Sequence, residues 1–262
     1  MKNTKILILF ILTLILSFCS KGSDEPSSTN NSATPSKQCY VSTVMRNGLL
    51  AYKYEFSDSL LSKTIWYNES GVAFASSEIQ YSNGIVSSVT DYESGIPTTK
   101  IECEISNDKI VKLKRYYYNP DNSLDYYSYY NLTYDSNSKL IKKEFYIVET
   151  GLRKTYYTYR WENENLIEQK IYSDDNNNIS LFSTTVYNYD THKNPYYKVG
   201  LEYISPEEFS KNNIISSSSI DTYTSTLRNF TYEYNSDSYP IKLTELDRNG
   251  NNTVREFIYT CP

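Results

Sequence analysis

The stretch SSEIQYSNGIVSSVTDY, Ser76–Tyr92, constrains the fold most, because it has the pattern of one β-hairpin and the rest of the chain repeats it. Before its turn, Ile79 and Tyr81 alternate with polar neighbours, which is the period-2 pattern of a strand with one buried face. Asn83 and Gly84 then supply a tight turn, because both residue types tolerate positive φ. A β-branched return strand follows, so the stretch predicts an antiparallel strand pair.

An aromatic or apolar residue ends each outgoing strand of this repeat, mostly at intervals of about 24 to 29 residues. Clear alternation precedes these residues, as in Tyr157-Tyr159-Trp161, and polar turns follow them. We therefore expect one all-β domain, residues 38–262, with roughly 14 to 17 strands in an antiparallel meander. The strand-ending residues are Phe56, Tyr81, Ile105, Tyr134, Trp161, Tyr189, Tyr234 and Tyr259.

A sheet of that size must twist, coil or close on itself. Pairing between nearest neighbours favours one long curved sheet, either an open half-barrel or a closed barrel, and the alternative is an ordinary two-sheet sandwich. One segment carries a helix signal: Ser205-Pro206-Glu207-Glu208 combines a capping residue, proline at the first helical position and an acidic first turn. We expect one short helix near residues 205–211.

The first 18 residues have the pattern of a signal peptide, not of part of the fold. The apolar run Ile6–Phe18 is too short for a membrane-spanning helix, which needs about 20 residues. Leu16-Ser17-Phe18-Cys19 resembles a bacterial lipobox, which implies that Cys19 receives a lipid. Phe18 departs from that motif, which has a small residue at this position, and the alternative is a plain secretory signal.

Residues 19–37 predict a disordered tether, because Ser20–Lys37 has no leucine, isoleucine, valine or aromatic residue with which to form a core. The start of this stretch, Ser20–Glu25, resembles the acidic export signals of Bacteroidota surface lipoproteins. That resemblance implies an outer-membrane lipoprotein that faces the cell surface and contacts the membrane through its N-terminal lipid.

Composition narrows the classes of partner. The chain has 31 Asp and Glu against 26 Lys and Arg, with both signs interspersed and no basic patch, so we expect no nucleic-acid partner. Tyrosine is the outlier, with 29 of 262 residues. Tyrosine favours pleated, half-buried surfaces, which agrees with a large sheet.

The repeat also resembles known families. Tyr187-Asn188-Tyr189-Asp190 before Asn194-Pro195, and Tyr232-Glu233-Tyr234 before Tyr239-Pro240-Ile241-Lys242, resemble the tyrosine-aspartate (Rhs-type) hairpin repeats. More closely, the chain from Cys39 to Cys261 is similar to Bacteroidota surface lipoproteins with a porin-like antiparallel β fold. The resemblance implies a fold and an envelope location, and it brings no activity and no catalytic residue.

Catalytic and metal-binding patterns are weak. His192 is the only histidine, and its place in a polar turn predicts an exposed loop residue. No Cys-x-x-Cys occurs, and the oxygen-rich run Asp174–Asn178 lacks the ligand spacing of a calcium loop. Carboxylates occur on nearly every strand, so no pair stands out for glycoside hydrolysis. We expect a non-enzymatic protein without cofactor or metal.

The tyrosine clusters are the candidate ligand-stacking residues, since a wet aromatic face suits sugars and proteins; the simpler explanation is that tyrosine is a good sheet former. We expect a binding or scaffolding module for a glycan or an envelope protein. The alternatives are a glycan-active hydrolase that uses a carboxylate pair, or a purely structural envelope protein. The candidate stacking residues are Tyr126, Tyr127, Tyr129, Tyr130, Tyr156 and Tyr157.

Three cysteines remain if Cys19 is lipidated, so at most one internal disulfide can form. Cys103 alternates with apolar residues, and we expect it to be a small buried thiol on the apolar face. Cys39 and Cys261 are the possible bridge. They begin the first strand and end the last, so they can meet only if the sheet closes or its ends curl together.

Overall fold

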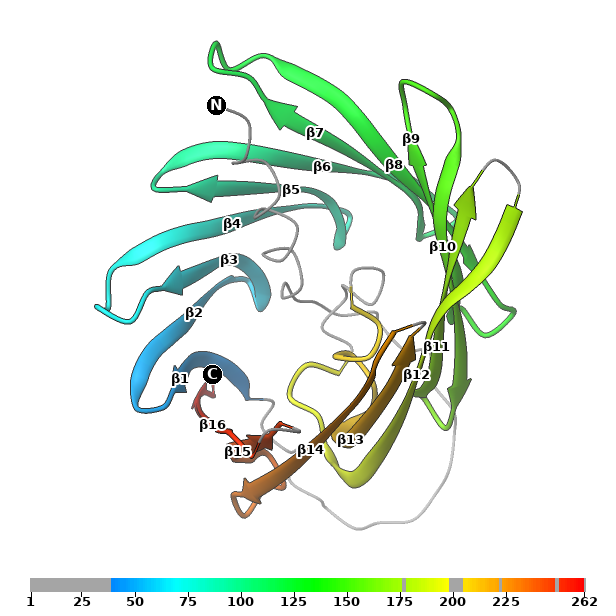
Figure 1. Ribbon diagram of the computed structural model, residues 1–262. Coiled ribbons are helices and arrows are strands. Elements are labelled where there is room, and N and C mark those ends of the chain that lie inside the picture. The colour runs from blue at the N-terminus through cyan, green and yellow to red at the C-terminus, as the bar shows by residue number, and fades with distance from the viewer. Residues whose placement is uncertain (1–38, 176–177, 198–204, 222, 248–249, 262) are drawn as a thin grey trace, which may run out of the picture.

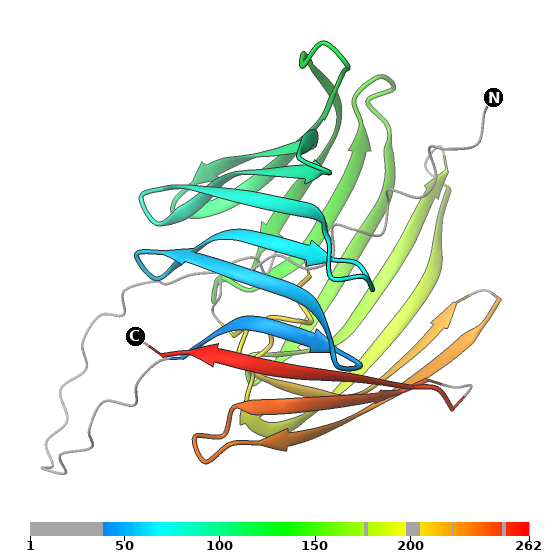
Figure 2. The same ribbon diagram turned by 90° about the vertical axis from the view of Figure 1, so that its left-hand side faces the viewer.

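The computed structural model describes residues 39–175, 178–197, 205–221, 223–247 and 250–261. Sixteen antiparallel strands in this part of the chain pair with their sequence neighbours, and β1 (Tyr40–Arg46) pairs with β16 (Asn252–Thr260) to close a barrel (Figures 1 and 2). The predicted all-β meander is confirmed, with a strand number inside the expected range. The two-sheet sandwich is wrong, because all the strands belong to one continuous ring.

The remaining strands follow in chain order: β2 (Leu49–Ser57), β3 (Leu60–Tyr67), β4 (Ala73–Ser82), β5 (Ile85–Glu93), β6 (Ile96–Ser106), β7 (Lys109–Tyr118), β8 (Leu124–Tyr134), β9 (Leu140–Ile147), β10 (Arg153–Glu162), β11 (Asn165–Asp175), β12 (Asn178–Lys193), β13 (Asn212–Asp221), β14 (Ser225–Tyr234) and β15 (Pro240–Leu246). The predicted signal peptide, the tether and Cys19 lie outside the described residues. Within the described part, no helix has the length and apolarity that a membrane crossing requires.

The strand-ending residues read from the sequence mark β-bulges. In the hairpin of β4 and β5, Asn83 and Gly84 have the expected positive φ, and the register shifts directly before Tyr81. Equivalent shifts occur beside the other seven strand-ending residues. Because each bulge bends its strand and increases the local twist, regular bulges curve the sheet until its edges meet.

Five of these residues also join neighbouring strands through their side chains. Tyr81 donates a hydrogen bond of 2.9 Å from its hydroxyl to the carbonyl oxygen of Leu61, the first buried residue of the preceding strand. Four equivalent bonds of 2.6–2.9 Å recur around the barrel, and we call all five aromatic staples. They explain part of the tyrosine excess, because the ring fills the core while its hydroxyl satisfies a carbonyl. The other four run from Tyr134 to Ile110, Trp161 to Leu140, Tyr189 to Leu166 and Tyr259 to Pro240.

The two faces of the wall differ in polarity. Buried apolar residues such as Leu61, Val89 and Leu166 face inward and form one connected core. The outer face carries ion pairs between neighbouring strands; the pairs Lys63–Glu78, Lys114–Glu104 and Lys242–Glu233 are joined at 2.9, 2.5 and 2.6 Å. This arrangement reverses the alternation of membrane-spanning barrels, whose outward side chains are apolar. The outer wall therefore carries charged pairs beside exposed apolar residues such as Val186 and Ile258, and the core lies inside.

The connection between β12 and β13 folds into the barrel (Figures 1 and 2), and we call its described residues, 194–197 and 205–211, the plug. The helix predicted near 205–211 is wrong: the segment forms consecutive turns, with backbone bonds from Glu208 to Ser205 and from Phe209 to Pro206. The physical reason is anchoring to the wall, since Phe209 is only 2% exposed and Ser210 is fully buried just before β13 begins. The proline and the acidic residues start a turn that has no room to continue.

A disulfide joins Cys39 to Cys261, with their Cα atoms 4.2 Å apart. It lies where β1 and β16 meet, so the bridge spans the seam of the closed barrel. The predicted condition for this pairing, a sheet that closes, is met. Cys103 remains a thiol and packs against the core from the inner face of β6, although it is only partly buried.

Candidate functional site in the barrel interior

The six tyrosines predicted to contact a ligand lie on different faces of the wall. Tyr130 and Tyr157 point inward and pack against the core, and Tyr127 is 40% exposed beside Tyr117, with ring centroids 5.1 Å apart. The other three lie outward and extend a row of rings across β7 to β11. We call this row the outer ladder; its members are Tyr116, Tyr126, Tyr129, Tyr146, Tyr156 and Tyr172.

Two rings of the outer ladder already have partners from both neighbouring strands. Tyr129 on β8 stacks on Tyr146 of β9, with centroids 4.8 Å apart, while Lys112 of β7 lies 4.2 Å from its centroid on the other side. Tyr156 is enclosed in the same way, by Tyr172 of β11 at 4.5 Å and Lys142 of β9 at 5.1 Å. A sugar stacks on an open ring face, so these rings brace the sheet instead of offering a stacking platform.

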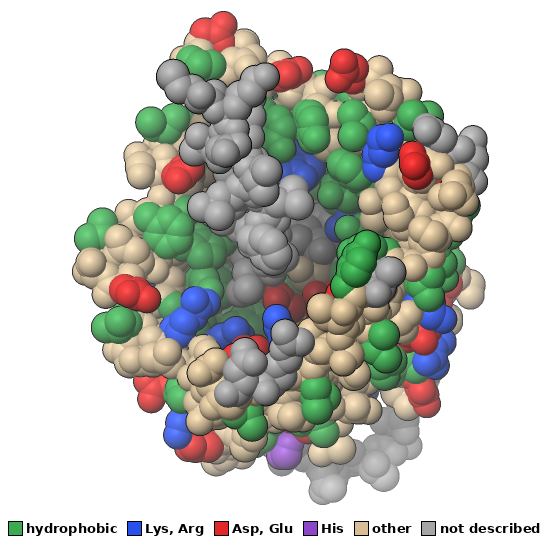
Figure 3. Space-filling model, in the orientation of Figure 1, with side chains coloured by type: hydrophobic (Ala, Val, Ile, Leu, Met, Phe, Trp, Pro, Cys, Tyr) green, Lys and Arg blue, Asp and Glu red, His purple; other side chains and the backbone are tan. Residues whose placement is uncertain are grey.

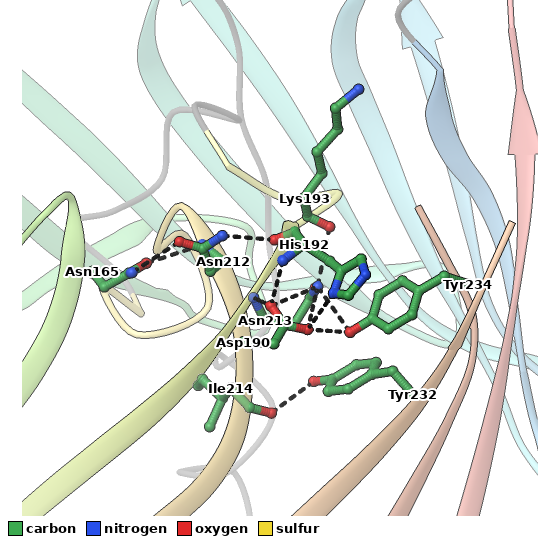
Figure 4. Close-up of polar contacts among 9 residues, drawn as sticks. All are labelled: Asn165, Asp190, His192, Lys193, Asn212, Asn213, Ile214, Tyr232 and Tyr234. Atoms are coloured by element: carbon green, nitrogen blue, oxygen red, sulfur yellow. Dashed lines mark hydrogen bonds and ion pairs between the residues drawn. The ribbon is translucent and has the colours of Figure 1, made fainter. Parts of the chain in front are cut away.

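His192 belongs to a polar cluster where the chain passes from β12 into the plug (Figure 4). Asp190 accepts hydrogen bonds from the Asn213 backbone N–H at 3.1 Å and from the Tyr234 hydroxyl, and its Oδ2 lies 3.7 Å from His192 Nδ1. The imidazole stacks on Tyr234 with centroids 3.9 Å apart. Among the described residues, no serine or cysteine joins this cluster, so it lacks the nucleophile of a triad. Its contacts tie the end of β12 to the start of β13.

A belt of polar side chains crosses the inner wall from β3 to β8, one residue from each strand. Register pairs Thr64 with Ser77, Ser77 with Asp91, and Asp91 with Thr99. The belt then steps along β7 by two residues to Arg115, which pairs with Ser128 on β8. We call these six residues the polar belt. Other inward positions of these strands carry apolar residues, so the polar belt interrupts the core.

Asp91 is the acidic centre of the belt. Its carboxylate accepts a hydrogen bond from the Ser77 hydroxyl and one of 2.8 Å from the Thr99 hydroxyl. Burial raises the pKa of Asp91, while the two hydroxyls and the positive charge of Arg115 pull it back down. The carboxylate therefore has hydroxyl donors on both oxygens before any ligand arrives.

Three belt atoms are buried without a partner. Thr64 Oγ1, Arg115 Nε and Ser128 Oγ have no hydrogen-bond partner among the described residues. Thr64 and Ser128 are fully buried, and Arg115 is 8% exposed. An unpaired buried polar group costs about 1–3 kcal/mol, so each of these groups is able to bond to a further donor or acceptor, such as water or a ligand.

Charged groups face the belt from the plug and from β9. Seen along the barrel, the surface is hollowed at its centre, and hydrophobic and charged side chains gather round the hollow (Figure 3). Burial lowers the pKa of Lys143 on β9 to about 8, and the charge of Arg115 acts in the same direction while Glu207 of the plug opposes it. Burial raises the pKa of Glu207, and it raises the pKa of Glu208 further because the Glu207 charge lies beside it.

The belt was not among the predicted site residues, although the sequence contains a signal for it. Ser77 lies between Ala75 and Ile79, and Thr99 precedes Ile101 by two positions, so both are polar residues at inward positions of a period-2 strand. The oxygen-rich run that begins at Asp174 takes part in ion pairing. The Asp174 side chain is buried, and its carboxylate accepts a hydrogen bond of 2.8 Å from Arg153 Nε. No metal-binding group of three or more such side chains occurs among the described residues.

Comparisons with solved structures support the architecture. A porin-like protein from Bacteroides vulgatus superposes with a TM-score of 0.52 at 11% identity, covering 84% of this chain and 99% of that one. A second porin-like protein, from Bacteroides uniformis, matches at a TM-score of 0.47 and 9% identity, over 84% of this chain and 98% of its own. No protein family and no curated protein sequence matches the chain. The first likeness shows that this chain has a porin-like barrel fold, as its resemblance implied.

Proposed function

We propose that this protein is an envelope-attached binding module whose ligand is a glycan held in the barrel interior against the polar belt. The observation that carries the proposal is the belt itself, in which six strands contribute polar side chains to one inner surface. The buried hydroxyls of Thr64 and Ser128 have no partner among the described residues, and sugar hydroxyls can both donate to such groups and accept from them.

The inner wall also supplies the apolar component that sugar binding needs. Tyr130 and Phe145 lie together on β8 and β9 with centroids 5.0 Å apart, and Tyr117 lies on the neighbouring β7. A binding site for a small molecule combines such aromatic surface with a few fixed polar groups. Two rings of the outer ladder, Tyr129 and Tyr156, have partners on both sides, which makes the ladder the weaker candidate for the same ligand.

The test is a glycan array probed with the full chain, followed by titration of the strongest glycan against two matched variants. Thr99→Val removes a belt hydroxyl at nearly constant volume and should weaken binding about 10-fold, which corresponds to roughly 1.4 kcal/mol. Thr90→Val makes the same change at an outward position of β5, opposite Glu78, and should leave the affinity unchanged. Equal affinities of both variants would show that the ligand does not contact the belt.

We also propose that Cys19 carries the lipid anchor and that residues 20–37 space the barrel from the outer membrane on the cell-surface side. Support comes from the short apolar run before Cys19 and from the charged pairs on the outer wall. Replacing Cys19 by Ala should abolish labelling with a palmitate analogue and release the protein from the membrane fraction. Cys103→Ala is the control and should keep the label; full labelling of the Cys19 variant would refute the anchor.

We further propose that the module binds without turnover. A hydrolase is the second candidate, and the plug gives it one specific support: Glu207 and Glu208 are neighbouring acids with raised pKa values, as a general acid requires. Incubation of the array's strongest glycan with the full chain distinguishes the two. Intact glycan after prolonged incubation supports binding, whereas cleavage that Glu208→Gln abolishes would support the hydrolase.

A further inference from the structure

Arg115 and Ser128 form the most incomplete part of the polar belt. They are direct cross-strand partners on the inner face of β7 and β8. Arg115 Nε and Ser128 Oγ both lack a hydrogen-bond partner among the described residues, although the side chains are 8% and 0% exposed. A guanidinium N–H and the hydroxyl of the cross-strand neighbour are two kinds of donor that a carboxylate can accept.

The acid on the belt leaves Arg115 available for a ligand. Asp91 is close enough to Arg115 for the two charges to interact, but its carboxylate already accepts the hydroxyls of Ser77 and Thr99. Arg115 also lies within hydrogen-bonding reach of the Tyr130 hydroxyl. Of the five N–H donors of the guanidinium, the one on Nε has no partner among the described residues.

A second cation reinforces this part of the wall. Lys143 on β9 faces inward opposite Leu132, and its ammonium lies 4.7 Å from the ring centroid of Tyr130. Arg115 and Lys143 thus approach the same tyrosine from strands on either side of β8. One cation over the ring of Tyr130 and a second at its hydroxyl fit a molecule that has an anionic group on a body with an apolar face.

We propose that the interior site binds an acidic saccharide through its carboxylate, which Arg115 and Ser128 hold while the sugar ring lies against Tyr130. This inference rests on the proposed glycan-binding function and names the class of glycan. Lys143 adds a second positive charge on the β9 side of the same ring.

The experiment titrates the full chain with uronate- and sialate-terminated oligosaccharides and with neutral counterparts of the same length and linkage. We expect at least one acidic member to bind at least 10-fold more tightly than its neutral counterpart at low salt. Arg115→Gln should remove that preference, because glutamine cannot pair with a carboxylate as a charge. Arg160→Gln is the matched control, since Arg160 is an outward arginine on β10 with an exposed side chain.

Ser128→Ala keeps the test valid if the Arg115 variant fails to fold. It deletes a buried hydroxyl that has no partner, so the fold should tolerate it while acidic-glycan affinity falls several-fold. If neutral and acidic members bind equally and Ser128→Ala changes nothing, the acidic preference is wrong but the glycan-binding function stands. If no member binds and Thr99→Val has no effect on any array glycan, both the acidic preference and the proposed function are overturned.

Discussion

The inner wall of the barrel has two unlike halves. On β9–β12, β16 and β2 the wall holds the plug: Ser210 accepts the Leu166 N–H at 3.0 Å, and Tyr196 packs edge-on against Tyr54 at 6.5 Å. On β3–β8 the wall carries the polar belt, with buried polar atoms that lack partners among the described residues. Such unpartnered buried atoms occur in both halves of the described wall, since Tyr54, His192 and Arg255 also carry one each. The halves differ in what lies on the wall: a segment of the chain itself covers one, and the other carries a continuous row of polar side chains.

The residues that build the barrel are therefore different from those of the proposed binding site. Aromatic staples occur in both halves, at Tyr81 and Tyr134 in the belt half and at Tyr189 and Tyr259 in the plug half. The repeat thus makes a uniform frame. The groups proposed to bind a ligand lie where individual inward positions depart from the repeat, as at Arg115.

The seam disulfide gives the largest expected effect. The double variant Cys39→Ser, Cys261→Ser should lose roughly 5 kcal/mol of unfolding free energy, because the bridge constrains a loop with a sequence separation of 222 in the unfolded chain. Cys103→Ser in the belt half is the control and should cost much less, since that thiol is only partly buried. Urea unfolding under oxidising conditions measures both. Equal losses would mean that the seam is not a special point of the ring.

Removing a side chain that anchors the plug should have the second-largest effect. Phe209→Ala should cost about 3–4 kcal/mol, the usual loss for truncating a buried phenylalanine, because the plug and the wall lose a shared core contact. Thr64→Val in the belt should be neutral or slightly stabilising, because it replaces an unpartnered buried hydroxyl with a methyl group. Thermal unfolding of both variants tests the comparison. A large loss from Thr64→Val would show that the belt hydroxyls are satisfied within the folded chain.

Low pH should stabilise the folded protein through the buried glutamates of the plug. The pKa of Glu208 is raised well above its ordinary value by burial and by the Glu207 charge, so the folded state binds a proton that the unfolded state has released. This stability is fully present below the ordinary glutamate pKa and is lost as pH rises through the raised value. Glu208→Gln should therefore raise stability at neutral pH, by less than the Phe209 loss, and bring no gain at pH about 4. Unfolding across that pH range, with exposed Glu233→Gln as control, checks the sign.

The barrel frame could be predicted from the sequence better than the candidate site, for a physical reason. Strand ends, bulges and turns depend on local signals, so Tyr81 and Asn83-Gly84 could be located from spacing and turn chemistry alone. The plug depends on where a long connection lies in space, and Ser205–Lys211 therefore appeared to be a helix. The polar belt depends on which strands become neighbours and on which face is inner. Arg115 and Ser128 lie 13 positions apart in the sequence and become partners only through the register of β7 and β8.

The smallest expected effect tests the frame that both halves share. Tyr134→Phe removes the staple to Ile110 and should cost about 1 kcal/mol, because the buried carbonyl loses its side-chain donor while the ring stays in the core. Tyr129→Phe, in the outer ladder, should change stability by less than about 0.5 kcal/mol, because its stacking with Tyr146 does not need the hydroxyl.

A substitution that adds a staple sharpens the same test. Ile105 occupies the staple position of β6 beside a register shift but has no donor, and the corresponding first buried residue of β5 is Val86. Ile105→Tyr should place a hydroxyl near the Val86 carbonyl and stabilise the barrel by up to about 1 kcal/mol. If Tyr134→Phe costs nothing and Ile105→Tyr gains nothing, the rings alone hold neighbouring strands together, and the tyrosine excess reflects packing and not hydrogen bonding.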